Sequence, residues 1–301
     1  MLINIHVLLT YTCPLQCDHC FIYASPRASG KLTPTQVTHL LEQTSTIKTI
    51  EWVYFEGGEP FLVYPLLLSS VKRAKRLGFK VGIISNGYFG RSEEAAMRYL
   101  KPLIALGLDR IYISSDQFHY KNTVNSPARK VIEASIKLGL PTTRIRIGEP
   151  QSSEQDPILK NDLFLDETRP LMMVGRAAEK IQLNPTNNDW RSFTICPFKD
   201  LEDPESIYID PFGNAQFCQG ITLGNVWSSP IHDLMDQIDI ASHPIYGPIR
   251  LNGPKGLVEE YNLAPLDEYQ DACHLCYATR RQLVNRFPEY LSPPQVYNIQ
   301  I

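Results

Sequence analysis

The stretch IEWVYFEGGEPFLVYPLLLSSVKRAKRLGFKVGIIS, residues 50–85, sets the pattern for the first two-thirds of the chain. Its apolar run at 50–55 predicts a strand, and the amphipathic run at 64–77 predicts a helix. Gly78 follows that helix, where a glycine can take the left-handed conformation that ends it. The apolar run at 80–85 predicts a second strand. A strand, a helix and a strand of these lengths predict two parallel strands joined by a helical crossover.

The same rhythm extends on both sides of this stretch. Thr33 and Pro34 suit the start of a helix, as N-cap and first helical residue, and Gly107 and Gly139 sit where later helices should end. Six such units are fewer than the eight of a closed TIM barrel, although periodicity alone leaves a doubly wound sheet open. The further strands are predicted at 3–9, 110–115, 143–148 and 171–174, and the further helices at 33–47, 91–106 and 126–139.

We therefore predict an α/β fold in which residues 1–185 form a partial (β/α)6 TIM-like barrel. The strand–helix pattern stops near residue 190, so residues 186–301 are predicted to form a small extension of β-hairpins and a helix. Residues 149–170 are polar and punctuated by prolines, which predicts an active-site loop or lid.

Composition narrows the functional classes. The 301 residues are 43% hydrophobic, which suits a globular protein. Their net charge of -3 gives no indication of the basic surface that binds nucleic acid. No run of eighteen apolar residues occurs, so no membrane partner is expected. Seven cysteines without an export signal predict a reducing, cytoplasmic setting. The basic run 72–76 is interpreted as a solvated helix end.

Cys13, Cys17 and Cys20 form the sharpest motif in the sequence, CPLQCDHC, directly after the first predicted strand. Thiolates are soft, anionic ligands that suit iron–sulfur clusters. Three of them on a four-iron cluster leave one iron without a protein ligand, which is where small-molecule chemistry can occur. The alternative is a structural zinc site, with Asp18 or His19 completing the ligands.

This CxxxCxxC pattern resembles that of the radical S-adenosylmethionine (SAM) enzymes. Glu56, Gly57, Gly58, Glu59 and Pro60 follow the second predicted strand and look like the GGEP motif of that family. The resemblance implies a SAM-binding 4Fe–4S cluster on the three cysteines, and a turn that binds the amino group of SAM. Glycines allow close approach of the backbone, and carbonyls with a carboxylate can receive an ammonium.

Polar residues follow the third and fourth predicted strands. Ser85 and Asn86 end the third, and Ser114 and Asp116 end the fourth. The resemblance implies that such positions reach the ribose and carboxylate of SAM, whereas the simpler interpretation is turns and helix caps.

Two arginines, Arg144 and Arg146, share one face of the fifth predicted strand. An inward arginine could hold a carboxylate or polarise a substrate, and ordinary salt bridging is the alternative. The candidates for acid–base work, all near strand ends, are Glu149, Arg146, Asp116 and His119.

The other four cysteines, Cys196, Cys218, Cys273 and Cys276, fall outside the strand–helix region. Residues 208–225 predict a strand, a turn and a second strand ending in cysteine. They resemble the hairpin that opens the SPASM and Twitch extensions of radical SAM enzymes, and residues 174–177 resemble the joining segment. The resemblance implies one auxiliary 4Fe–4S cluster, as in the shorter Twitch type, because a SPASM extension needs more cysteines. A zinc site remains the alternative.

Family membership would imply reductive cleavage of SAM to a 5'-deoxyadenosyl radical, which takes a hydrogen atom from substrate. An electron donor such as flavodoxin or ferredoxin would be the protein partner. We expect oxidation of a small polar molecule, with the auxiliary cluster accepting the electron, as in Twitch-type alcohol dehydrogenases. Modification of a ribosomally made peptide is the alternative, less favoured because the motif begins at residue 13, with no leader-binding domain before it. Outside enzymes, a zinc-binding structural module is the competing hypothesis.

Overall fold

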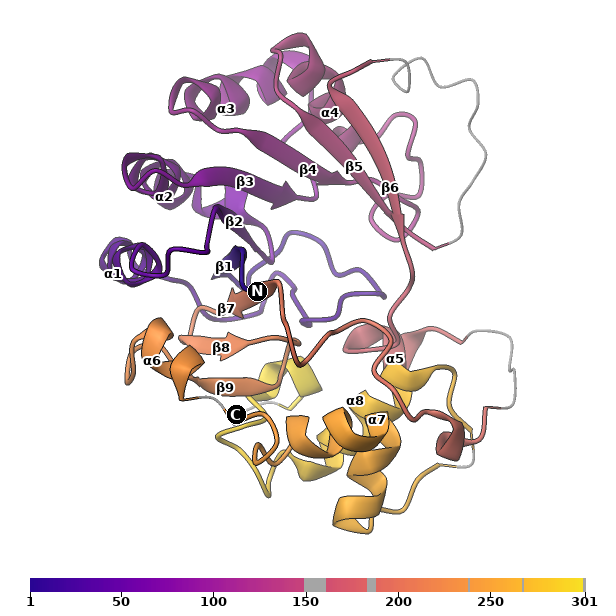
Figure 1. The fold of residues 1–301 in the computed structure, drawn as a ribbon. Helices are drawn as coiled ribbons and strands as arrows, with labels where there is room; N and C mark the ends of the chain where they lie inside the picture. The colour runs from indigo at the N-terminus through magenta and orange to yellow at the C-terminus, as the bar shows by residue number, and fades with distance from the viewer. Residues whose placement is uncertain (149–160, 183–187, 238, 267, 300–301) are drawn as a thin grey trace. The chain divides into compact units, whose positions relative to one another are not determined.

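The computed structural model describes residues 1–148, 161–182, 188–237, 239–266 and 268–299 (Figure 1). The chain divides into two compact units. The first, here called the barrel unit, comprises residues 4–15 and 25–171. The second, the C-terminal unit, comprises residues 1–3, 16–24 and 172–301.

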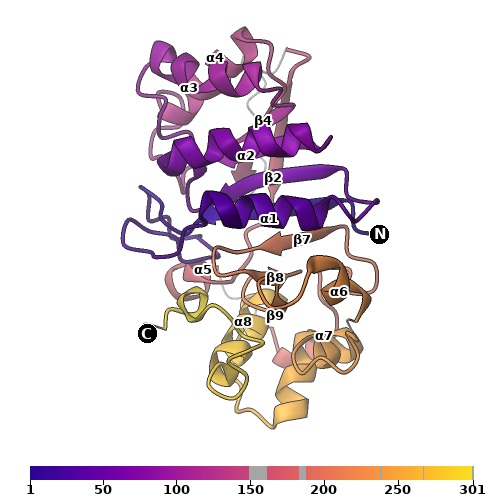
Figure 2. The ribbon, with the colours of Figure 1, turned by 90° about the vertical axis from the view of Figure 1, so that its left-hand side faces the viewer.

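The barrel unit is built on six parallel strands, each paired with the next along the chain. Figure 2 shows its four helices lying on one face of these strands. The order is linear from the first strand to the sixth, so this sheet is not closed, as the partial barrel prediction required. The strands are β1 (Asn4–Thr10), β2 (Trp52–Gly57), β3 (Lys80–Ser85), β4 (Arg110–Ser114), β5 (Thr142–Ile147) and β6 (Phe164–Arg169); the helices are α1 (Pro34–Thr44), α2 (Tyr64–Arg76), α3 (Glu93–Ala105) and α4 (Pro127–Lys137), with a 3-10 turn η1 (Pro60–Val63) before α2.

Alternation along the strands gives the sheet one apolar and one polar face. Val7, Phe55, Ile83 and Ile111 lie in register on neighbouring strands, and none of their side chains is exposed. The adjacent row, one residue earlier on each strand, includes His6 and the ring stacked on it, Tyr54, with 4.8 Å between ring centroids. Polar chemistry in the barrel unit is therefore confined to one face and to the strand ends.

The predicted helix ends are confirmed. Thr33 caps α1 with its side chain on the backbone of Gln36, and the Gln36 side chain returns to the Thr33 backbone. Glycines 78, 107 and 139 have φ of 90°, 90° and 74°, the left-handed conformation expected after a helix.

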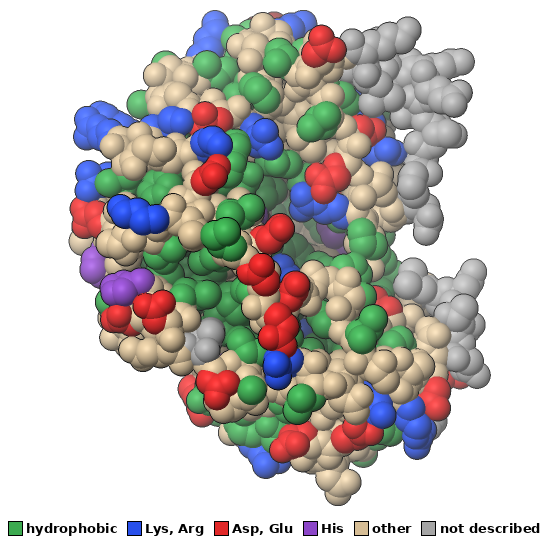
Figure 3. All heavy atoms as spheres, in the orientation of Figure 1, with side chains coloured by type: hydrophobic (Ala, Val, Ile, Leu, Met, Phe, Trp, Pro, Cys, Tyr) green, Lys and Arg blue, Asp and Glu red, His purple; other side chains and the backbone are tan. Residues whose placement is uncertain are grey.

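Two of the four basic side chains at the end of α2 pair with acidic neighbours. Arg73 pairs with Glu42, and Lys75 lies 2.7 Å from the carboxylate of Asp109. Figure 3 shows Lys and Arg side chains scattered over the face drawn rather than gathered in one field. This agrees with a solvated helix end.

The sixth strand differs from its prediction. Residues 171–174 carry no strand, and β6 lies earlier, at Phe164–Arg169, within the stretch predicted as a loop. Among the described strands, β6 pairs only with β5, and it stays half exposed, so its sequence FLDETR carries no apolar run. The register sets Asp166 opposite Arg144. Residues 149–160, the rest of the predicted lid, lie outside the described residues.

The C-terminal unit combines antiparallel strands with short helices. The predicted strand–turn–strand is confirmed by the pairing of β7 with β8, and β9 then pairs with β8. Helix α7 is interrupted by a kink at Asn252 and Gly253. The elements are β7 (Ser206–Ile209), β8 (Asn214–Gln216), β9 (Thr222–Asn225), α5 (Arg176–Lys180), α6 (Ile231–Asp236), α7 (Tyr246–Tyr261), α8 (Ala272–Leu283), and the 3-10 turns η3 (Trp190–Ser192) and η4 (Pro294–Tyr297). Among the described helices, none is both long and apolar enough to cross a membrane.

Candidate active site

Cys13 follows β1 in the barrel unit and is held through both its backbone and its sulfur. Its backbone N–H donates to the carbonyl of Ser25 at 3.0 Å. Its Sγ accepts from the side-chain amide of Asn86 at 3.4 Å. Both Cys13 and Asn86 are buried. The sulfur therefore already lies beside a donor, the environment that a metal-bound thiolate requires.

Cys17 and Cys20 belong to the C-terminal unit, where Arg176 organises their loop. The Arg176 guanidinium donates to the carbonyls of Cys17 at 2.5 Å and Ala24 at 2.6 Å, and its backbone N–H donates to that of Cys20 at 3.0 Å. A Cβ on Gly175 would lie 2.7 Å from the Cys20 carbonyl oxygen, so only glycine fits there. Burial raises the pKa of the Cys20 thiol, and the charge of Arg176 opposes that rise.

The GGEP turn packs directly on the segment that leads to Cys13. The N–H of Gly58 donates to the Thr10 carbonyl at 2.6 Å, and that of Glu59 to the Thr12 carbonyl at 3.0 Å. A Cβ on Gly57 or Gly58 would lie 2.3 Å from the Thr10 or the Thr12 carbonyl oxygen, respectively. The two glycines thus permit contact between two pieces of backbone. From the sequence alone, their small size is explained by the close approach of a ligand to the backbone.

Glu59 is fully buried, and its carboxylate binds its own chain. It accepts from the Ser85 hydroxyl at 2.9 Å, from the backbone N–H of Asn86 at 2.9 Å and from that of Phe61 at 3.0 Å. Burial raises the pKa of Glu59 to about 7, against the opposing effect of these donors. Glu59 therefore ties the GGEP turn to the end of β3, and this tie places Asn86 beside Cys13.

Asp116 and His119 are the two candidate acid–base residues that the structure brings together. The Asp116 carboxylate lies 2.8 Å from His119 Nδ1 and accepts from the backbone N–H of Ile147 at 3.1 Å. A carboxylate that holds one ring nitrogen leaves the other oriented for proton transfer. Ser114, the last residue of β4, is half-buried. Glu149 lies outside the described residues.

Arg144 and Arg146 converge on a carboxylate that sequence reasoning missed. Arg144 makes two hydrogen bonds to Asp166, at 2.9 and 2.5 Å, and Arg146 lies 3.1 Å from the same carboxylate. The salt-bridging alternative for these arginines is therefore present in the structure. If residues 164–169 had been predicted as a strand next to β5, the register between the two strands would have placed Asp166 opposite Arg144.

Glu56, proposed from the sequence as a cofactor ligand, pairs with His6 on the polar face of the sheet. His6 Nδ1 lies 2.7 Å from the Glu56 carboxylate. His6 was missed, although a histidine that alternates with Ile5 and Val7 in a buried strand was a signal in the sequence.

The four later cysteines come from three separate segments of the C-terminal unit. Cys196 follows η3, where Gly253 in the α7 kink packs so closely that its Cβ would lie 2.3 Å from the Ile195 backbone nitrogen. Cys218 follows β8, and its N–H donates to the Tyr246 hydroxyl at 2.9 Å. Cys273 and Cys276 lie in the first turns of α8.

These four thiols lie close enough to affect one another electrostatically. Burial raises the pKa of Cys276 to about 12, and Cys218 and Cys196 add to the rise. Burial also raises the pKa of Cys273, reinforced by the other three cysteines. All seven cysteines are free thiols. Within the described part of the chain, no group of three or more His, Cys, Asp or Glu side chains is arranged around a single metal-ion position.

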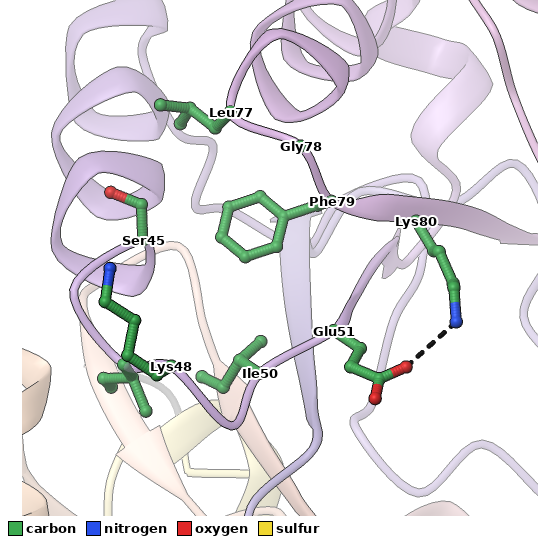
Figure 4. A pocket seen from close by; sticks show the side chains of 9 residues that line it. Ser45, Lys48, Ile50, Glu51, Leu77, Gly78, Phe79 and Lys80 are labelled. Carbon is green, nitrogen blue, oxygen red and sulfur yellow. Dashed lines mark hydrogen bonds and ion pairs between the residues drawn. The ribbon is translucent and has the colours of Figure 1, made fainter.

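The barrel unit also has a hollow of about 420 Å³ (Figure 4). It opens at the amino ends of β2 and β3, whereas Glu59 and Ser85 lie at or beyond their carboxyl ends. Lys80 and Glu51 form an ion pair of 2.9 Å at its rim. Its lining is Ser45, Ile47, Lys48, Ile50, Glu51, Leu77, Gly78, Phe79 and Lys80.

Comparison with known families supplies the context for these groups. Residues 7–156 match the model of the radical SAM superfamily. This chain belongs to that superfamily. A radical SAM domain works with a 4Fe–4S cluster and SAM. The residues present fit those groups, since three thiols lie within eight residues and one sulfur already accepts an amide N–H.

Relatives of this radical SAM chain include proteins of different activity. The putative peptide biosynthesis protein YydG of Bacillus subtilis (strain 168) is 25% identical over 210 residues, covering 68% of this chain and 63% of YydG. The tungsten-containing aldehyde ferredoxin oxidoreductase cofactor-modifying protein of Pyrococcus furiosus is 30% identical over 113 residues, covering 37% and 30%. The matches thus span less than two-thirds of either relative.

Two solved structures share the fold. BtrN in complex with AdoMet and 2-DOIA has a TM-score of 0.51 at 16% identity, over 84% of this chain and 88% of that chain. Native anSMEcpe with bound AdoMet has a TM-score of 0.52 at 12% identity, over 98% of both chains. At these identities the likeness extends to the fold alone, and it agrees with the open parallel sheet.

Proposed function

We propose that this radical SAM enzyme contains two iron–sulfur centres and oxidises its substrate after abstraction of a hydrogen atom. Cys13, Cys17 and Cys20 would hold the SAM-binding cluster. Cys196, Cys218, Cys273 and Cys276 would hold an auxiliary cluster in an extension of the Twitch type. The observation that carries the proposal is the gathering of these four cysteines, from three separate segments, into mutual electrostatic reach.

When bound, the cluster and SAM supply the one-electron chemistry that generates the hydrogen-abstracting radical. The chain's own residues would position and complete that chemistry. The GGEP turn and Glu59 fix the end of β3, and Asn86 donates to the sulfur of Cys13. The Asp116–His119 pair offers an oriented base.

An oxidation of this kind removes one hydrogen atom, one proton and one electron from the substrate. SAM on its cluster would supply the radical that abstracts the hydrogen atom, and His119 would accept the proton at Nε2. The four later cysteines would hold an auxiliary centre with no free iron for substrate, and this centre would supply the acceptor for the electron. A small polar molecule is the first candidate substrate, because the open face and strand ends of the barrel unit carry His6, Glu56 and the Arg144–Asp166 pair.

A ribosomally made peptide is the second candidate substrate. It is favoured by the name of YydG, a putative peptide biosynthesis protein, whose similarity extends over 68% of this chain. Incubation with peptides encoded beside the gene, followed by mass spectrometry, separates the candidates. A mass change in such a peptide supports the second, and turnover of a sugar or cyclitol alcohol supports the first.

The two-centre proposal itself is tested by metal analysis. Protein reconstituted without oxygen should be brown and hold about eight iron atoms per chain, the content of two four-iron clusters. With reductant and SAM it should release 5'-deoxyadenosine and methionine. Stoichiometric zinc without iron would contradict the proposal and favour a structural module.

A further inference from the structure

Arg280 is the largest fully buried side chain among the described residues, with 1% of its surface exposed. It lies on α8, one turn beyond Cys276. Burying a guanidinium is costly unless a negative charge compensates it, because the group stays protonated in proteins. A buried arginine therefore indicates where negative charge must be found.

The hydrogen bonds of Arg280 all go to neutral acceptors. Its Nε donates to the carbonyl of Cys276 at 3.3 Å, and its Nη1 donates to the carbonyl of Gln219 at 3.0 Å and to the Tyr297 hydroxyl at 3.2 Å. None of the ion pairs formed by the described residues joins Arg280 to an aspartate or glutamate. These contacts engage Nε and Nη1 and leave the charge of the guanidinium uncompensated.

The groups that can carry negative charge beside Arg280 include two of the four later cysteines. The guanidinium donates to the carbonyl of Cys276 and to the carbonyl of Gln219, the residue after Cys218. It therefore bridges the two segments that carry these cysteines. These contacts set the charge of Arg280 beside the two cysteines, which bind iron as thiolates.

The position of Arg280 is fixed by its surroundings. The Tyr297 hydroxyl donates to the carbonyl of Gly220 at 2.6 Å, and the Tyr297 ring lies under the guanidinium at 5.6 Å. Tyr297 stacks in turn on Tyr277, with centroids 5.7 Å apart. The neighbouring Arg281 differs, since it is partly exposed and pairs with Glu179 at 3.0 Å.

We propose that Arg280 is the fixed counter-charge of the auxiliary centre and raises its reduction potential, so that the centre accepts the electron released by the substrate radical. The inference rests on the proposed function. A cluster gains one negative charge when it takes up one electron, and a nearby buried cation stabilises the reduced form more than the oxidised form. Arg280 is thus a positioning residue that acts through the cysteine site.

The test is a redox titration of the anaerobically reconstituted full-length protein, followed by EPR. Addition of SAM identifies the signal of the SAM-binding cluster, so the remaining signal reports the auxiliary centre. Arg280→Gln should lower the equilibrium constant for electron uptake by the auxiliary centre at least tenfold, which is about 59 mV for a one-electron couple. Arg280→Lys, which keeps the charge, should stay near wild type. Arg281→Gln is the matched control and should leave the potential unchanged.

Several outcomes would overturn the role of Arg280. One is an Arg280→Gln protein that keeps eight iron atoms and an unchanged potential. Another is an equal shift in Arg280→Gln and Arg280→Lys, which would assign the effect to the shape of the guanidinium rather than its charge. If Arg280→Gln binds only four iron atoms, Arg280→Lys decides: eight support the counter-charge and four contradict it. A wild-type protein with four iron atoms would instead refute the proposed function, which keeps the two failures distinct.

Discussion

The two sets of cysteines reach similar surroundings by opposite routes. The first three lie within eight residues of sequence, whereas the later four depend on a kinked helix, a hairpin and a helix start to bring them together. Each set has a buried arginine on a cysteine carbonyl, Arg176 on Cys17 and Arg280 on Cys276. Cys13 also has the side-chain amide of Asn86 on its sulfur. A ligand motif can thus be local in sequence while the groups around it come from distant segments.

The largest effect is expected when the cysteines of either set are replaced, because each replacement should remove one cluster. Replacing Cys13, Cys17 and Cys20 together by Ala should leave about four iron atoms and abolish release of 5'-deoxyadenosine. Replacing Cys273 and Cys276 by Ala should also leave about four, but spare SAM cleavage and stop formation of oxidised product. Iron analysis and chromatography of the SAM products measure both variants.

Retention of the SAM-dependent EPR signal shows that the Cys273/Cys276 variant is folded. Full product formation in that folded variant would remove the electron-acceptor role and favour redox-neutral chemistry such as epimerisation. Undiminished SAM cleavage in the triple variant would show that the first set was misassigned.

The next effect concerns the backbone that supports the first set. Gly58→Val should destabilise the barrel unit by more than about 3 kcal/mol, because a Cβ would lie 2.3 Å from the Thr12 carbonyl oxygen and no side chain can move aside. Gly139→Ala is the matched comparison, with φ of 74° and open space around the Cβ position. It should cost about 1–2 kcal/mol from backbone strain alone. Thermal unfolding compares them, and equal costs would contradict the close packing of the turn.

A third prediction concerns the buried carboxyl of Glu59, which accepts a hydrogen bond from the backbone N–H of Asn86. Burial raises the pKa of Glu59 to about 7 from its usual 4.5. Because the folded pKa is raised, this group's stabilising contribution is complete below about pH 4.5 and is lost as the pH rises through about 7. The fold should therefore lose about 3 kcal/mol of stability from this group over that range.

Glu59→Gln should flatten this part of the pH dependence, as measured by calorimetry. In wild-type protein, the infrared band of a protonated carboxyl should disappear with a midpoint near pH 7 and be missing from the variant. A midpoint near pH 4.5 would show that the donors to Glu59 outweigh its burial.

The smallest expected effect is that of the amide on Cys13. Asn86→Ala removes the N–H donor to the sulfur and should lower the potential of the SAM-binding cluster by less than the tenfold change expected for Arg280→Gln. EPR-monitored titration measures it, with Asn122→Ala, in an exposed turn, as control. A larger shift than that of Arg280→Gln would invert the comparison, because a neutral donor would then outweigh a full charge.

The sequence was most informative where local chemistry decides the structure. The strand–helix rhythm, the cap at Thr33 and the glycines after the helices all follow from preferences within a few residues, and the structure confirms them. Strand β6 was misplaced because its stability comes from β5 and from the Asp166 ion pairs, which no local pattern reveals.

The candidate site divides in the same way. The cysteines and the GGEP turn were visible as motifs, whereas the roles of Glu59 and Arg280 depend on burial. The sequence predicts that the Glu59 carboxylate binds the ammonium group of SAM. In the structure this carboxylate accepts hydrogen bonds from Ser85 and Asn86. Arg280 is one arginine among many in the sequence, and only the fold shows that it is enclosed.

The division of the chain into units has a practical consequence for protein engineering. Residues 16–24 pack with the C-terminal unit, through the bonds of Arg176 to the carbonyls of Cys17 and Ala24, although they lie near the start of the chain. The C-terminal segment is therefore not a cassette that can be exchanged between homologues with a single cut. A chimera that imports a foreign segment from residue 172 onward must import residues 16–24 with it, or else recreate their contacts with Gly175 and Arg176.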